Sequence, residues 1–154
     1  MIKTISKVLI VLLISLTSLS IGAQSMPSSI IVKFDDNVNL PLSTLEKTFI
    51  NEAYGDAAYK EIYSRPHRLK FIKQILRNRV QIVKLTQKHL SLNYPKLSEV
   101  PVFKSFNKTL KRDVVFNPNN FNPLKYTFSF YSKKSYTYQV DGTNYGIVIK
   151  SQYQ

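Results

Sequence analysis

The stretch from Arg65 to Lys96 reads RPHRLKFIKQILRNRVQIVKLTQKHLSLNYPK and contains no aspartate or glutamate. Basic residues recur through it among aliphatic residues at helical spacing. Ser64 suits the N-cap of a helix, and Pro66 suits its first turn, where the missing N–H would have no intrahelical partner. We therefore predict one long basic amphipathic helix from Arg65 to about Leu90.

Five cations of this predicted helix fall on one stripe about 60° wide when successive residues are placed about 100° apart. They are Lys70, Lys73, Arg77, Lys84 and Lys88. The aliphatic residues occupy the opposite half of the helix, so that half should face the core. The stripe has two interpretations: a solvated face that serves solubility, or a docking surface for an anionic partner.

Arg68 and Arg79 fall inside the aliphatic half of the predicted helix. A charged side chain there must reach solvent along its own stem, pair with a carboxylate, or lie at an exposed helix end. Structural ion pairing is the favoured interpretation, with acids from outside the stretch as partners. The candidates are Glu52, Glu61, Glu99 and Asp113. The alternative is a recessed arginine that binds the carboxylate or phosphate of a ligand, and Arg79 is the residue to test for it.

Residues 1–23 have the layout of a secretory signal peptide. Two lysines precede an apolar run from Val8 to Leu19, and the small residues that follow end at Ala23. We predict cleavage near Ala23 and export to the periplasm or the extracellular space. A membrane anchor is disfavoured because the apolar run is short for a bilayer core of about 30 Å.

Residues 24–154 suffice for a single small α+β domain. The whole chain has a formal net charge of +13, and loss of Lys3 and Lys7 would leave +11. Such a balance favours an anionic partner: an anionic polymer, a membrane surface or an acidic protein. The chain has no cysteine, which excludes a disulfide scaffold. No specific nucleic-acid motif is present, and the sequence does not indicate an oligomeric state.

Ser43-Thr44-Leu45-Glu46 has the form of a helix capping box and predicts a helix to about Tyr54. Further on, apolar and polar residues alternate in three short runs, Tyr126–Phe130, Tyr136–Val140 and Tyr145–Ile149. Tight polar connections between the runs predict a three-stranded antiparallel meander, which short strands near 30–34 and 114–116 could extend. The expected fold class is α+β, with the long basic helix of an N-terminal helical part packed on the C-terminal meander.

No catalytic, metal-binding or cofactor-binding motif is found in the sequence. His67 and His89 lie about 33 Å apart on the predicted helix, so they cannot share a metal ion. The alternating tyrosines and phenylalanines of the three runs should form the core. An aromatic–basic contact is expected instead at a hairpin tip formed by Tyr131, Lys133 and Lys134.

These features favour a non-enzymatic exported binding or accessory protein that contacts an anionic envelope or extracellular partner. The alternative is a structural or assembly component whose basic helix meets an acidic protein. A carboxylate-based hydrolase is a third hypothesis, disfavoured because nine acids are few and none lies in a catalytic signature. No cofactor is predicted.

Overall fold

The computed structural model describes residues 34–153 of the chain. All of these residues belong to one compact unit of the chain. The predicted signal peptide lies outside the described residues, as does all but Phe34 of the predicted strand near 30–34. Between residues 34 and 153, no helix is both long enough and apolar enough to cross a membrane.

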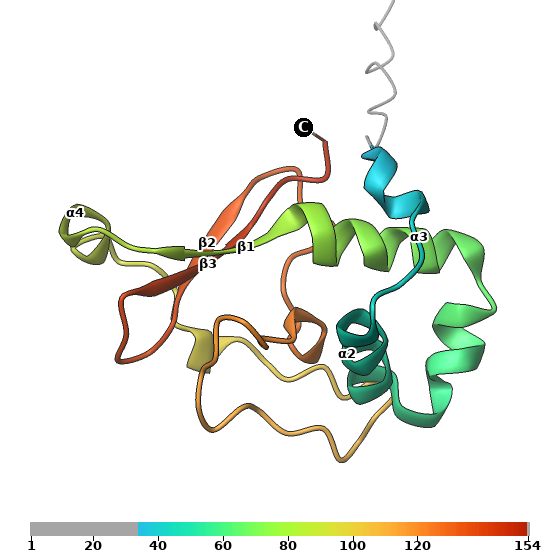
Figure 1. Ribbon diagram of the computed structural model, residues 1–154. Helices are drawn as coiled ribbons and strands as arrows, with labels where there is room; N and C mark the ends of the chain where they lie inside the picture. The colour runs from blue at the N-terminus through green and yellow to red at the C-terminus, as the bar shows by residue number, and fades with distance from the viewer. Residues whose placement is uncertain (1–33, 154) are drawn as a thin grey trace, which may run out of the picture. The chain divides into compact units, whose positions relative to one another are not determined.

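The first half of the described chain is helical (Figure 1). A 3₁₀ turn, η1 (Asp36–Asn39), precedes helix α2 (Thr44–Tyr54). The predicted capping box begins α2: Ser43 Oγ accepts from the Glu46 N–H at 3.1 Å, and the Ser43 N–H donates to the Glu46 carboxylate at 2.7 Å. Gly55 ends the helix with a φ of 54°, a left-handed conformation that glycine adopts without strain.

Two short turns lead from α2 into the next helix. They are η2 (Gly55–Ala57) and the π-helical turn η3 (Tyr59–Tyr63), and helix α3 (Pro66–Gln74) follows. Pro66 occupies the first turn of α3, as predicted, although Arg65 and not Ser64 is its N-cap residue. A second π-helical turn, η4 (Ile75–Arg79), continues α3 without a break.

The predicted long helix is wrong beyond Arg79. Val80 has an extended backbone, with φ −98° and ψ 123°, and strand β1 (Val80–Lys84) starts there. Three of its five residues are β-branched, which favours a strand, and the strand finds backbone partners elsewhere in the chain. The apolar residues of the predicted helix covered half of the helical wheel. The apolar residues of β1 fall within so wide an arc, so the sequence pattern alone did not distinguish a strand from a helix at this point. A short helix, α4 (Gln87–Leu90), follows β1.

β1 belongs to a three-stranded antiparallel sheet with the order β1-β3-β2. The middle strand, β3 (Tyr145–Ile149), pairs with β1 from Val80↔Ile149 to Lys84↔Tyr145. On its other side β3 pairs with β2 (Tyr136–Gln139). β2 and β3 match the second and third predicted strands.

The first predicted strand, Tyr126–Phe130, is not part of this sheet, because β1 takes the third place beside β3. Tyr126 makes only an isolated antiparallel bridge with Val102. Tyr126 and Phe128 are nevertheless buried while the residues between and after them are exposed, so the predicted alternation describes burial correctly. Residues 114–116 also form no strand, since they lie in a loop whose two valines are exposed to solvent.

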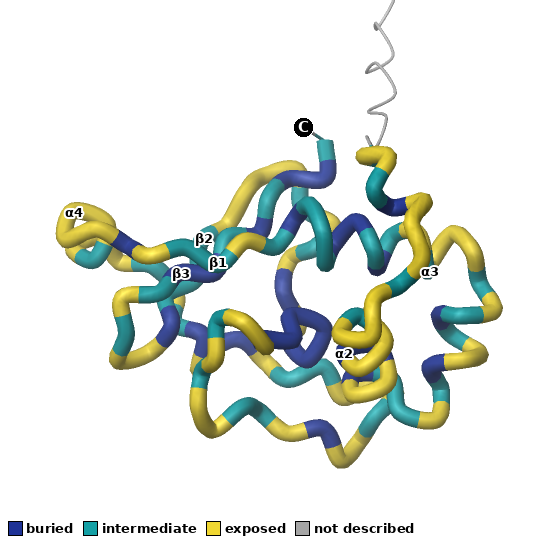
Figure 2. The backbone as a smooth tube through the Cα atoms, in the orientation of Figure 1, coloured by how far each residue is buried: buried dark blue, intermediate teal, exposed yellow. Residues whose placement is uncertain are grey.

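Two hydrophobic clusters hold these elements together. The first lies among the helices and contains Phe49, Ile50, Ala53, Ala58, Ile62, Ile72, Ile75 and Leu124. The second lies against the sheet and contains Leu97, Val100, Phe121, Tyr126, Phe128, Val140, Ile147 and Ile149. Segment 121–126 is buried throughout and contributes to both (Figure 2). Val80 and Phe130 also pack against both clusters, so the helical half and the sheet are joined where η4 becomes β1.

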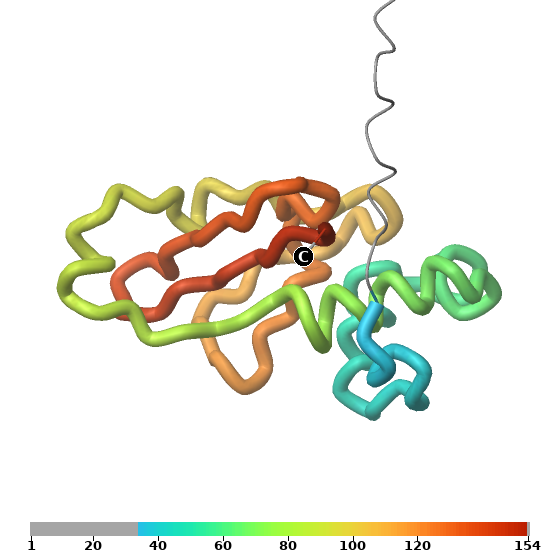
Figure 3. The backbone as a smooth tube through the Cα atoms, turned by 90° about the horizontal axis from the view of Figure 1, so that it is seen from above, coloured from blue at the N-terminus to red at the C-terminus, as the bar shows by residue number. Residues whose placement is uncertain are grey.

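The α+β fold class is confirmed. Helices pack on a three-stranded antiparallel sheet, and the view in Figure 3 places the helical half beside one end of that sheet, with β3 between β1 and β2. The helical half extends from α2 to η4, and β1 continues directly from it (Figure 1).

Gly146 tests the packing of the sheet, because it lies in β3 opposite Val83 and Gln139. A Cβ atom at this position would approach the Leu85 side chain to 2.8 Å at Cδ2 and 3.1 Å at Cγ. Gly146→Ala should therefore lower the free energy of unfolding by about 1–3 kcal/mol through overpacking. Urea denaturation would measure this change.

The contact with Leu85 also predicts that the two sites are coupled. In the double variant Gly146→Ala/Leu85→Ala, the space left by the leucine accommodates the new methyl group, so the loss of stability should be smaller than the sum of the two single losses. Additive losses would show that the alanine at position 146 is accommodated without displacing Leu85.

Candidate functional site

A cleft lined mainly by aromatic side chains opens beside α3. Its lining residues are Tyr54, Ile62, His67, Arg68, Phe71, Ile72, Phe103, Phe106 and Tyr131. Its volume is about 390 Å³, and an adjoining cavity of about 150 Å³ shares four of these residues. Pockets for small ligands have this character, with mostly apolar walls and a few polar groups. We call this site the aromatic cleft.

Two groups of contacting rings form walls of the aromatic cleft. In the first, Tyr54 stacks on Phe106 with ring centroids 5.2 Å apart, and Phe103 contacts both rings edge-on at 5.7 and 5.8 Å. In the second, Phe71 stacks on Tyr131 with centroids 5.0 Å apart and planes 7° from parallel. Phe106 is 39% exposed and Tyr131 73% exposed, so both groups leave ring surface that a ligand can cover.

The polar groups of the cleft include a phenol and an arginine that shares its carboxylate partner. Arg68 pairs with Glu61, and Arg65 Nη1 lies 3.3 Å from the same carboxylate. One carboxylate beside two guanidinium groups leaves an excess of positive charge. Burial raises the pKa of Tyr54 to about 12, and the phenol of Tyr131 adds to this shift, so Tyr54 carries a neutral hydroxyl at physiological pH.

The predicted hairpin tip supplies part of this cleft. Tyr131 lies in the lining, although its ring stacks on Phe71 and not against a lysine. Lys133 makes an aromatic–basic contact with a different residue, since its Nζ lies 5.9 Å from the ring centroid of Tyr153. Lys134 is exposed.

Of the nine lining residues, only Arg68 and Tyr131 were candidate site residues from the sequence, and the missed aromatic residues include Tyr54, Phe103 and Phe106. Tyr54 is the last residue of α2 and reads as part of its apolar pattern. Phe103 and Phe106 belong to an irregular segment without helical or strand periodicity. Two phenylalanines in a chain segment with no regular structure were the available signal, because such side chains need a partner surface outside their own element.

The five cations of the predicted stripe do not share one helix face. Lys70, Lys73 and Arg77 lie on the continuous segment α3–η4, whereas Lys84 ends β1 and Lys88 lies in α4. The cause is the change from helix to strand at residue 80, which removes the periodicity that aligned them. Lys84 and Lys88 are exposed.

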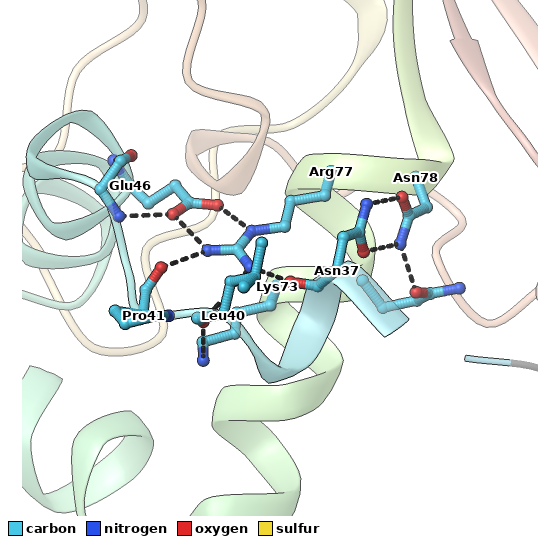
Figure 4. A network of polar contacts seen from close by, with 9 residues as sticks. Asn37, Leu40, Pro41, Glu46, Lys73, Arg77 and Asn78 are labelled. Carbon is cyan, nitrogen blue, oxygen red and sulfur yellow. Dashed lines mark hydrogen bonds and ion pairs between the residues drawn. The ribbon is translucent and has the colours of Figure 1, made fainter. Parts of the chain in front are cut away.

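Arg77 instead holds the segment that precedes α2 (Figure 4). Its guanidinium donates to both carboxylate oxygens of Glu46, at 2.6 and 2.8 Å. It also donates to the carbonyl oxygens of Asn37, Leu40 and Pro41. Lys73 Nζ donates to the Leu40 carbonyl at 2.7 Å. We call this set of contacts the Arg77 clamp, and it gives two of the five stripe cations partners within the protein.

The two arginines of the aliphatic half have different surroundings. Arg68 pairs with Glu61, one of the four acids predicted as candidate partners. Arg79 is only 2% exposed, and its Nε and Nη2 donate to the Lys150 carbonyl at 3.1 and 2.8 Å. Within residues 34–153, no carboxylate lies within ion-pair distance of Arg79.

Two carboxylates line a separate cavity of about 270 Å³, and both accept hydrogen bonds. Asp113 accepts from Lys125 Nζ at 2.5 Å and from the Tyr126 hydroxyl at 3.1 Å. Asp141 accepts from the Ser98 hydroxyl at 2.6 Å and from the Ser98 N–H at 2.9 Å. Partial burial would raise the pKa of Asp141, but the Ser98 hydrogen bonds outweigh it and the pKa is lowered. A general acid needs the opposite shift of its pKa.

In the described part of the chain, no three His, Cys, Asp or Glu side chains are grouped to hold a metal ion.

Comparison with protein-family models, curated proteins and solved structures finds no match to this chain. A function must therefore be argued from the geometry and charges of the sites themselves.

The Arg77 clamp predicts a pH dependence of stability. The hydrogen bonds from Arg77 lower the pKa of Glu46 below its ordinary value of 4.5, against the opposing effect of burial. A lowered pKa means that the pair stabilises the fold above the ordinary value and that this contribution is lost as the pH falls through the lowered one. Arg77→Met should cost about 1–3 kcal/mol of unfolding free energy near neutral pH, because it leaves a half-buried carboxylate unpaired. The difference from the wild type should shrink in acid.

Arg65→Met is the matched control, because it also removes an arginine from an ion pair, here one whose carboxylate keeps Arg68 as a partner. The loss should stay below about 1 kcal/mol, as for exposed ion pairs. Chemical denaturation at several pH values measures both variants. Equal losses for the two, or a loss for Arg77→Met that persists unchanged below the Glu46 pKa, would contradict the assignment.

Proposed function

We propose that this chain is an exported, non-enzymatic binding protein that takes the apolar or aromatic part of an anionic ligand into the aromatic cleft. The observation that carries the proposal is the cleft itself, with stacked rings on its walls and an arginine that shares its carboxylate partner. Export is supported by the charged, apolar and small-residue pattern of residues 1–23.

The walls of the cleft favour a ligand with a flat or apolar body. Exposed aromatic surface is costly in water, and its burial is worth about 25 cal/mol per Å² of apolar area. Tyr131 and Phe106 each leave ring surface exposed while a second ring supports them from behind or from the edge. A planar or acyl group can insert against such rings without a large rearrangement of the protein.

The charges near the cleft favour a ligand with an acidic group. Lys104 and Lys108 lie on the same loop as Phe106, and Lys133 and Lys134 follow Tyr131 after one serine. All four lysines are exposed. Together with Arg68 they supply a positive potential that concentrates anions near the cleft. The ligand class is therefore an amphiphilic anion, which fits a component of a cell envelope or of the extracellular space.

Two fluorescent probes of nearly the same shape test the proposal. 1-Anilinonaphthalene-8-sulfonate carries a negative charge, and N-phenyl-1-naphthylamine is its neutral counterpart. Both should bind the wild-type protein saturably. Phe106→Ala and Tyr131→Ala should each weaken the binding of both probes about fivefold, because each removes one ring contact of about 1 kcal/mol. Arg68→Met should weaken only the sulfonate probe, and salt should reduce that difference.

Tyr59→Ala is the matched control for Tyr131→Ala. Both tyrosines are 73% exposed, but Tyr59 does not line the cleft. Tyr59→Ala should leave the affinity for both probes unchanged, with circular dichroism confirming that each variant is folded. If the two tyrosine variants behave alike, or if no probe binds saturably, the cleft is not a ligand site and the proposal fails.

A further inference from the structure

Two cationic side chains are buried within residues 34–153, and they differ in their ion-pair partners. Lys125 is 5% exposed and pairs with two carboxylates, Glu52 at 2.7 Å and Asp113 at 2.5 Å. Arg79 is 2% exposed and has no carboxylate partner among the described residues. A guanidinium group remains charged at any physiological pH, so Arg79 is a buried positive charge without an ion pair in the described part of the chain.

The hydrogen bonds of Arg79 are incomplete as well. The Lys150 carbonyl accepts from Nε and Nη2, and the Phe71 ring lies under the guanidinium, with Cζ 5.9 Å from the ring centroid. Nη1 has no hydrogen-bond partner and is the one buried side-chain nitrogen or oxygen atom of the described chain in that state. Buried donors without a partner are rare in native proteins and call for an unseen acceptor.

The carboxylates that the sequence offered as partners for Arg79 are all engaged elsewhere. Glu52 and Asp113 bind Lys125. Glu61 binds Arg68, and Glu99 accepts a hydrogen bond from the Lys96 N–H at 3.1 Å. The acceptor for Arg79 therefore has to come from outside this set.

A polar cavity of about 260 Å³ lies beside Arg79. Its lining residues are Asp35, Gln74, Asn78, Arg79, Lys150, Ser151 and Gln152. Internal hydrogen bonds hold this wall in place: Asn78 Nδ2 donates to Gln74 Oε1 at 2.6 Å, and Gln152 Nε2 donates to the Tyr131 carbonyl at 2.9 Å. A fixed polar wall around a buried cation is the arrangement that anion sites require, because binding then orders few side chains.

We infer that this cavity binds a small oxyanion, a phosphate or carboxylate group, through the guanidinium of Arg79. A second basic residue, Lys150, lines the same cavity. Asp35 lines it too, and a carboxylate there favours an anion that also offers a hydrogen-bond donor, such as dihydrogen phosphate or a hydroxy acid. The cavity shares no lining residue with the aromatic cleft, although Phe71 of the cleft contacts the Arg79 guanidinium. The inference rests on Arg79 and its cavity and not on the function proposed for the cleft.

Nuclear magnetic resonance of the wild-type protein tests the inference directly. With ¹⁵N-labelled arginine, titration of inorganic phosphate should shift the side-chain signals of Arg79 saturably. Arg112 is the internal control, because its guanidinium donates to the carbonyls of Leu97, Ser98 and Val100 and should not respond. Malate and sulfate are titrated in parallel. A stronger shift of the Arg79 signals with phosphate than with malate indicates phosphorylated ligands, and the reverse order indicates hydroxy acids. Sulfate, which has no donor at neutral pH, should bind more weakly than either.

If none of the three anions shifts Arg79 saturably, or if Arg79 and Arg112 shift alike, the inference is overturned and water alone serves the free nitrogen. Arg79→Lys keeps the charge but loses the forked donors, so phosphate binding should weaken about tenfold. Should this variant fail to fold, the wild-type titration still decides. Phe106→Ala should leave the phosphate response unchanged, and phosphate should not displace the naphthalene probes, so failure at either site is distinguishable from failure at the other.

Discussion

The contact between Arg77 and Glu46 is the constraint on which the helical half depends. Glu46 serves two partners at once, because its carboxylate caps the start of α2 and receives the guanidinium from η4. One side chain therefore fixes both where α2 begins and where it sits against the segment that becomes β1. α2 in turn delivers Phe49 and Ile50 to the helical cluster and Tyr54 to the aromatic cleft. An ion pair outside the cleft thus helps to position the helix that supplies one of its aromatic residues.

Basic residues of the same stretch have distinct roles because their partners differ. Arg77 is satisfied by a carboxylate and three carbonyl groups, and it acts within the fold. Arg68 shares the Glu61 carboxylate with a second arginine, so one carboxylate neutralises only part of the positive charge beside the cleft. Arg79 has a carbonyl partner but no ion-pair partner among residues 34–153. The three arginines carry the same charge. They differ in the number and kind of hydrogen-bond acceptors around each guanidinium group.

Local patterns predicted what local interactions determine. The capping box at Ser43, the position of Pro66 and the alternation in β2 and β3 each depend on neighbouring residues, and each was predicted. The change from helix to strand at Val80 was not, because the strand depends on pairing with Ile149, far along the chain. The aromatic cleft was missed for the same reason, since its rings come from four separate segments. Arg79 could be singled out because a charged side chain among apolar residues needs a partner or access to solvent in any fold.

The middle strand of the sheet is also the last strand along the chain. Within the three-stranded sheet, β1 and β2 each pair with β3 and not with each other, so neither has a partner in the sheet until residues 145–149 are available. α2, by contrast, forms from neighbouring residues and can begin early. During synthesis the helical half of the described chain is consequently complete before the sheet can form. Synthesis can proceed on a chain that has not yet closed its second core, and the sheet can fold only once its central strand is available.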